Sequence, residues 1–174
     1  MENPIALREL LSLFQVLLGW VLTLVGGFAG NYLRQRMDLK SERKNLSGAF
    51  AGEIGALLSI VERRGYLSGI EHLIQHINET RAAWTFHFSA RRNYFRVYEN
   101  NASKIGILSH PLPEKIARLY TQAYSILEDI DDMRSPEVAA WSTDEALHRL
   151  QEMRDLLHDT IQLGHDIVDT INRN

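Results

Sequence analysis

The sequence predicts an all-α protein, in which an N-terminal single transmembrane helix continues into a cytoplasmic four-helix-bundle-like domain. Three observations predict this fold. Residues 10–33 contain no charged side chain. Beyond them, apolar residues recur at the i, i+3, i+4, i+7 spacing of amphipathic helices. The 4 prolines and 11 glycines among 174 residues are few for a turn-rich β-fold.

The composition excludes several classes of function. The chain is 45% apolar and 24% charged, has a net charge of −3, and contains no cysteine. A disulfide scaffold, a thiolate metal site and a cysteine nucleophile are therefore excluded. Nucleic-acid binding is not expected, because the chain has no basic excess. The sequence contains no glycine-rich phosphate loop after a strand, no G-x-S-x-G and no H-E-x-x-H, so we expect neither a catalytic site nor a cofactor.

The uncharged segment is long enough to cross a membrane. Its 24 residues, 10–33, exceed the roughly 20 apolar residues that span a bilayer core. A buried core helix would show a polar face, and this segment shows none. A cleaved signal peptide would follow a basic segment, whereas residues 1–9 hold Glu2, Arg8 and Glu9. We expect residues 1–9 to form a short extracytoplasmic N-terminus and 10–33 to form the transmembrane helix.

The residues after this segment predict its orientation. Residues 34–44 hold five lysines and arginines, whereas one arginine precedes the span. Basic residues near a span stay on the cytoplasmic side, so we expect the N-terminus outside a bacterial inner (plasma) membrane and the bulk of the chain in the cytoplasm. The same side chains would attract anionic membrane lipid: Arg34, Arg36, Lys40, Arg43 and Lys44.

Small residues of the span share one helical face. They recur at spacings of three and four and include a G-x-x-x-G pair, which lets two helix backbones approach closely. Frequent glycine in membrane helices is the simpler explanation. The pattern predicts a homo-oligomer formed through a transmembrane seam: Ser12, Gly19, Thr23, Gly26 and Gly30.

Residues 45–174 contain four amphipathic segments. The first continues from the membrane segment to about Arg63 and ends at Gly65, and the last opens with Ser142 and Glu145 at the spacing of a capping box. Because each apolar stripe must be buried against another, a four-helix bundle is the economical arrangement. The expected helices cover residues up to about 63, 67–82, 113–133 and 142 onward.

An aromatic stretch at 84–98 is the most distinctive part of this domain. Six aromatic residues alternate there with three arginines, and both types dominate interface energetics. They either close one end of the bundle or bind a protein partner or lipid. Nucleic acid is disfavoured, because residues 45–174 hold 13 Lys and Arg against 18 Asp and Glu. The predicted partner surface is Trp84, Phe86, Phe88, Arg91, Arg92, Tyr94, Phe95, Arg96 and Tyr98.

Two histidine patterns have metal-ligand spacing, but we expect no metal site. His72, His76 and Glu79 share a helix face that points away from that helix's apolar stripe, whereas a bundle-core site needs inward ligands. Glu145 and His148 have the Glu-x-x-His spacing of di-iron bundles, but the motif occurs once and at a helix start.

These observations favour a non-enzymatic role as a membrane-anchored interaction or scaffold protein with an unidentified protein partner. One alternative is a membrane-tethered signalling or effector component, in which association of the transmembrane helices affects the bundle through the continuous helix. The other is a metal-binding helical-bundle enzyme that uses the histidines. Architecture alone does not select among them.

Overall fold

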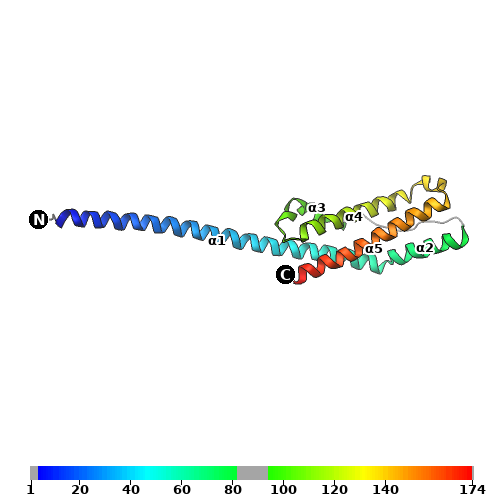
Figure 1. The fold of residues 1–174 in the computed structure, drawn as a ribbon, viewed down its shortest axis with the longest axis horizontal. Helices are drawn as coiled ribbons and strands as arrows, with labels where there is room; N and C mark the ends of the chain where they lie inside the picture. The colour runs from blue at the N-terminus through cyan, green and yellow to red at the C-terminus, as the bar shows by residue number, and fades with distance from the viewer. Residues whose placement is uncertain (1–3, 82–93, 174) are drawn as a thin grey trace. The chain divides into compact units, whose positions relative to one another are not determined.

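The computed structural model describes the backbone of residues 4–81 and 94–173. Within these ranges, the side chains of 4–18, 21, 29, 137 and 139 are not described. All secondary structure in the described ranges is helical, so the all-α prediction is confirmed. The elements are α1 (Pro4–Arg63), α2 (Tyr66–Thr80), α3 (Arg96–Asn101), η2 (Ala102–Ile107), α4 (Leu112–Asp132), η3 (Pro136–Ala140) and α5 (Thr143–Arg173) (Figure 1).

Helices α2 and α4 begin and end within two residues of the predicted positions, α1 ends at the predicted Arg63, and α5 begins one residue after Ser142. Helix α1 begins at Pro4, inside the segment 1–9 that was predicted to precede the membrane helix. The helix ends follow local signals: α1 stops before Gly65, and Ser142 Oγ accepts a hydrogen bond from the Glu145 amide at the start of α5 (3.2 Å). The Glu145 carboxylate does not complete the capping box but lies 3.7 Å from the Arg149 guanidinium. The short elements α3, η2 and η3 were not predicted, because one or two turns show no periodicity.

The chain divides into two compact units, residues 1–43 and residues 44–174. The N-terminal unit consists of the first part of α1. Within the part of the chain whose residues are described, no helix has the combination of length and apolar character needed to cross a bilayer. Residues 10–18 begin the predicted span, and their side chains lie outside that part. The span at 10–33 therefore stays a prediction.

In the C-terminal unit, α5 is the helix on which the others pack. Helix α4 lies along α5, and α2 packs on the first part of α5. The last part of α1 shares a core with the second half of α5, through Phe50, Ile54 and Ile167. Helices α1 and α2 thus follow one another along α5 (Figure 1). The unit has three rows of helices, which differs from the predicted bundle of four helices side by side.

The turn at Gly65 explains this difference. Gly65 has φ 60°, and its carbonyl accepts a hydrogen bond from the Gly69 amide (2.9 Å), so helical bonding resumes at once. One left-handed residue redirects the helix without reversing it. The sequence identified the end of α1 correctly but did not specify the new direction.

Replacing Gly65 with alanine is expected to lower the free energy of unfolding by about 1–2 kcal/mol, because a Cβ disfavours the left-handed conformation. The new Cβ would also lie 3.1 Å from Ser68 Oγ. Gly52→Ala is the matched control: Gly52 is exposed on α1 with nothing near its Cβ position, so alanine should stabilise the helix by up to about 1 kcal/mol. Denaturation midpoints measure both variants, and equal effects would contradict this account of the turn.

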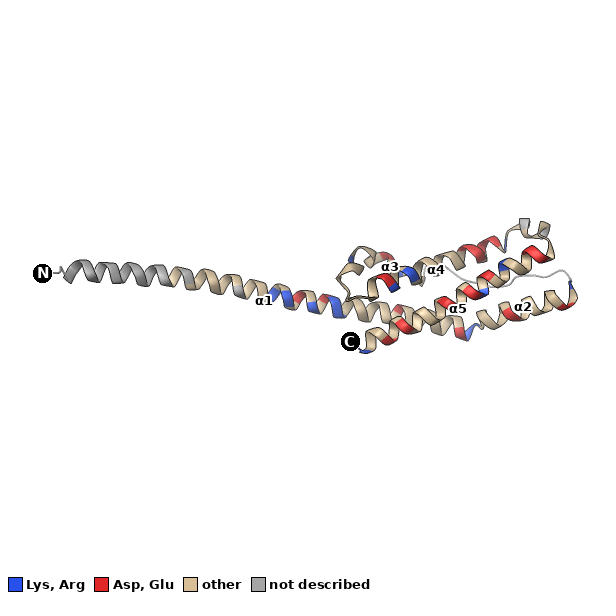
Figure 2. Ribbon diagram, viewed as in Figure 1, with Lys and Arg blue, Asp and Glu red and all other residues tan. Residues whose placement is uncertain are grey.

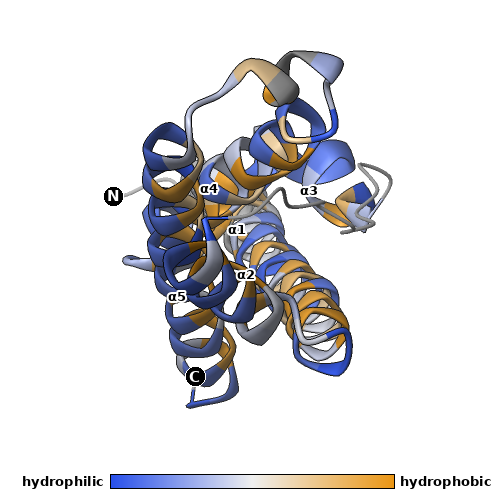
Figure 3. Cartoon of the chain, turned by 90° about the vertical axis from the view of Figure 1, so that its right-hand side faces the viewer, coloured by the Kyte–Doolittle hydropathy of each residue, from blue (hydrophilic) through white to orange (hydrophobic). Residues whose placement is uncertain are grey.

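Two clusters of buried apolar residues form the interior of the C-terminal unit. The first core joins α1, α3, η2, α4 and the end of α5, and the second joins α2, the end of α4 and the start of α5. Figure 3 shows hydrophobic and hydrophilic residues on the helices of this unit. Gly164 is buried where α5 meets α1, and a Cβ there would lie 3.0 Å from Leu58. A side chain at 164 would therefore require the Leu58 side chain to move.

Candidate functional site

The described side chains at 20–39 of α1 form an exposed apolar segment. Trp20 is 69% exposed and Phe28 is 76% exposed. At about 100° per residue, Trp20 and Leu22 point to opposite sides of the helix, so the apolar character is not confined to one stripe. A helix that is apolar all round is normally covered by protein or lipid. The large apolar side chains that are more than half exposed are Trp20, Leu22, Leu24, Val25, Phe28, Tyr32, Leu33, Met37 and Leu39.

The predicted seam lies on this segment and is accessible. A Cβ added at Gly19, Gly26 or Gly30 would meet no atom within 4 Å. Thr23 turns its hydroxyl onto its own helix and donates to the Gly19 carbonyl at 2.8 Å. Ser12 lies outside the described side chains. A second helix could therefore approach the backbone closely at the three glycines.

The basic residues that follow are all exposed, and most of them share a side of α1. Arg36, Lys40, Arg43 and Lys44 fall within an arc of about 100°, and Arg34 lies outside it. The acidic residues of the same segment, Asp38 and Glu42, project from the other side. Figure 2 shows these basic residues on α1 and the acidic residues spread over α4 and α5.

The described part of the aromatic stretch belongs mainly to the first core. Phe95 is 4% exposed, and Tyr94 and Tyr98 are half-buried and pack against that core. Arg96 is exposed at the start of α3. Phe95 is therefore unavailable as a contact residue for a partner. The remaining residues of the predicted surface, Trp84, Phe86, Phe88, Arg91 and Arg92, lie outside the described residues.

A carboxylate that the sequence did not single out holds this region in place. Glu53 on α1 accepts hydrogen bonds from the Val97 amide (2.6 Å), the Tyr98 amide (3.1 Å) and the Tyr120 hydroxyl (2.5 Å). Phe95, the residue before α3, provides no side-chain cap. Glu53 therefore supplies the cap from a distant helix and joins α1, α3 and α4. The only feature of the sequence that could have pointed to Glu53 is that a carboxylate stands there among the apolar positions of α1.

The tyrosine rings around Glu53 pack against other aromatic rings in the interior of the C-terminal unit. Tyr98 stacks on Tyr120 at 4.0 Å between ring centroids, and Phe95 meets the edge of Tyr124 at 4.8 Å. Burial and the hydrogen bond to Glu53 raise the pKa of Tyr120 well above its usual range. Burial and the hydrogen bond to Glu99 raise the pKa of Tyr124 to about 12. Both phenols are therefore protonated donors at neutral pH.

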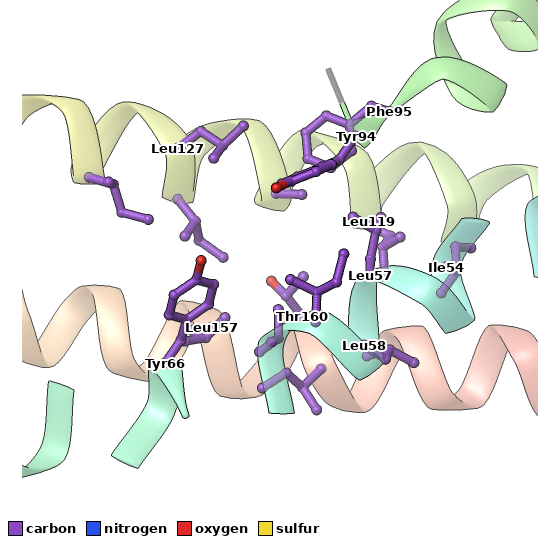
Figure 4. Close-up of a pocket in the computed structure, with 16 residues that line it drawn as sticks. Ile54, Leu57, Leu58, Tyr66, Tyr94, Phe95, Leu119, Leu127, Leu157 and Thr160 are labelled. Carbon is purple, nitrogen blue, oxygen red and sulfur yellow. The ribbon is translucent and has the colours of Figure 1, made fainter. Parts of the chain in front are cut away.

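A cavity of about 110 Å³ lies beside these aromatic rings. Figure 4 shows side chains arranged around it: Leu119 and Leu127 from α4, Leu57 from α1 and Thr160 from α5. The space is partly open at the surface of the unit, and its lining is apolar.

The histidine patterns do not form a metal site in the described structure. His72, His76 and Glu79 are exposed on α2, whereas Ile74 and Ile77 on the opposite side are buried. No cluster of three histidine, aspartate or glutamate side chains with metal-binding geometry occurs among the described residues. The exposed His148 ring lies 3.5 Å from the Glu152 carboxylate on its own helix.

The acidic end of α4 borders a small hollow. Burial is the main cause that raises the pKa of Asp129, and the neighbouring charges of Asp132 and Glu152 raise it further. The Arg149 guanidinium opposes the shift in part and lies 4.5 Å from the centre of the Trp141 ring. The charged form of Asp129 is therefore disfavoured in the folded state.

Asp129→Asn is expected to raise the free energy of unfolding at neutral pH by roughly 0.5–1 kcal/mol. Because the folded-state pKa lies above the ordinary value of 3.8, stability falls as the pH rises through this range and the carboxyl ionises. The gain should therefore disappear near pH 3. Asp131→Asn is the control, since Asp131 is exposed and lies 3.4 Å from Arg134. Denaturation midpoints at the two pH values test this, and a gain that persists in acid would contradict it.

Comparison of the chain with protein-family models, with curated proteins and with solved structures finds no match. The class of protein is therefore defined by its own fold and surfaces. It is an all-α protein with an exposed apolar helical segment, a one-sided group of basic residues and a packed helical unit that contains an apolar cavity.

Proposed function

We propose that this protein is a single-span membrane protein whose helical C-terminal unit acts as a cytoplasmic interaction or scaffold module. The observation that carries the proposal is the exposed apolar segment of α1. Large apolar side chains are exposed there and point in several directions. Exposed apolar surface of this extent marks an interaction site or a membrane segment.

Lipid is the covering that the sequence favours. The part of the exposed segment from Trp20 to Leu33 belongs to an uncharged run of 24 residues, which is long enough to cross a bilayer core. Charged side chains on one side of α1 would be expected if another protein chain covered only the other side, and residues 10–33 contain none. The basic residues directly after the run support an orientation with the C-terminal unit in the cytoplasm.

The three exposed glycines support self-association within the membrane. In lipid the hydrophobic effect does not drive helices together, so helices associate through close packing, and small residues allow their backbones to approach closely. A dimer or larger homo-oligomer would present several copies of the C-terminal unit at one place on the membrane. Such an arrangement suits a scaffold that collects a protein partner.

The proposal is tested by fractionating cells that produce the full chain. We expect the protein in the membrane pellet after ultracentrifugation, resistant to extraction at alkaline pH and released by detergent. A reporter that is active only in the cytoplasm, fused after Asn174, should be active. Intact protein in the supernatant would overturn the anchor, and a fusion active only in the periplasm would overturn the orientation.

A further inference from the structure

The lining of the 110 Å³ cavity is almost entirely apolar. It contains no charged side chain among its sixteen described residues, and its polar groups are hydroxyls. Thr160 donates its hydroxyl to the Leu156 carbonyl at 2.7 Å, and the Tyr66 hydroxyl accepts from Arg64 at 2.8 Å. A buried water needs two to four polar partners, and the hydroxyl groups of Tyr66, Tyr94 and Thr160 are the only polar side-chain groups in the described lining. The cavity therefore disfavours water and any polar or charged ligand.

The volume sets the size of the ligand. An engineered cavity of about 150 Å³ lined by Leu, Ile and Phe stays dry and binds benzene or xenon. The present cavity has the same type of lining and a volume of about 110 Å³. We propose that it is a binding site for a small apolar molecule no larger than one aromatic ring, or for a hydrocarbon segment of that size.

The position of the cavity gives such a ligand a structural effect. Its lining combines residues of the first core, such as Ile54 and Leu127, with residues of the second core, such as Ile130 and Leu157. It adjoins the turn at Gly65, where α1 ends and the row of apolar side chains is interrupted. A bound molecule would contact α1, α4 and α5 at once and would stabilise the folded unit through mass action.

The test uses the full chain in detergent micelles, with isotope-labelled isoleucine methyl groups and benzene as the probe. We expect benzene to shift the methyl resonances of Ile126, Ile130 and Ile161, which line the cavity, in a saturable way. The resonances of Ile77 and Ile116 should stay unchanged, because these residues are fully buried but do not line the cavity. These internal controls separate binding from partition of benzene into the micelle.

Ala123→Leu provides the decisive variant, since Ala123 lines the cavity and a leucine side chain would fill much of it. This variant should remain folded and lose the benzene-induced shifts. Ser125→Leu adds the same side chain on the exposed side of α4 and should keep them. The proposal is overturned if benzene shifts none of the lining methyls, shifts all isoleucines alike, or acts equally on folded Ala123→Leu. None of these outcomes depends on whether α1 enters a membrane.

Discussion

Replacing both Leu22 and Val25 with arginine is expected to move the protein from the membrane pellet to the supernatant. On the insertion scale, thirteen Leu, Val and Phe residues of the run 10–33 contribute roughly −4 to −8 kcal/mol together, and each arginine near the centre costs about 2.5–3.5 kcal/mol. Two arginines therefore cancel most or all of the favourable term. Leu22 lies near the middle of the run, where this cost is greatest.

The control for this prediction is Leu22→Phe with Val25→Ile, which keeps both positions apolar and should leave the protein in the pellet. Sedimentation at high salt and alkaline pH separates an inserted helix from one held by its basic residues alone. An arginine variant that stays in the pellet, folded and extractable only by detergent, would show that residues 10–33 do not carry the anchor.

Glu53→Ala is expected to cause the largest loss of stability among single polar substitutions in the C-terminal unit. The substitution leaves two amides of α3 and the Tyr120 hydroxyl without their acceptor. Each unsatisfied buried donor costs about 1–3 kcal/mol, and partial access of water reduces the total to roughly 3 kcal/mol. Tyr120→Phe removes one of the three bonds and should cost about 1 kcal/mol.

Two measurements distinguish this role of Glu53 from a general effect of losing a glutamate. Amide hydrogen exchange at Val97 and Tyr98 should accelerate in Glu53→Ala but not in Tyr120→Phe. Glu62→Ala removes an exposed carboxylate from the same helix and should change the denaturation midpoint by less than the equivalent of about 0.5 kcal/mol. If the Glu53 and Glu62 variants unfold at the same midpoint, the capping role assigned to Glu53 is wrong.

The candidate sites differ in how far local sequence could predict them. The seam and the basic residues are consecutive turns of one helix, so residue spacing alone predicts which of them share a side. The residues around Glu53 could not be found this way, because Glu53 is 44 positions from Val97 and 67 from Tyr120. The sequence also could not predict which residues of the aromatic stretch are buried, since the pattern of residues is the same whether Phe95 is buried or exposed.

The sequence by itself determined the four long helices, the end of α1 and the start of α5, because periodicity, a left-handed glycine and a capping serine act over a few residues. It also determined the uncharged run and the basic residues after it. The tertiary structure decided that α1 and α2 share one row along α5, that Glu53 caps α3, and that a cavity lies where the two cores meet. These features depend on the direction in which the chain leaves Gly65 and on packing between distant helices, which local preferences do not encode.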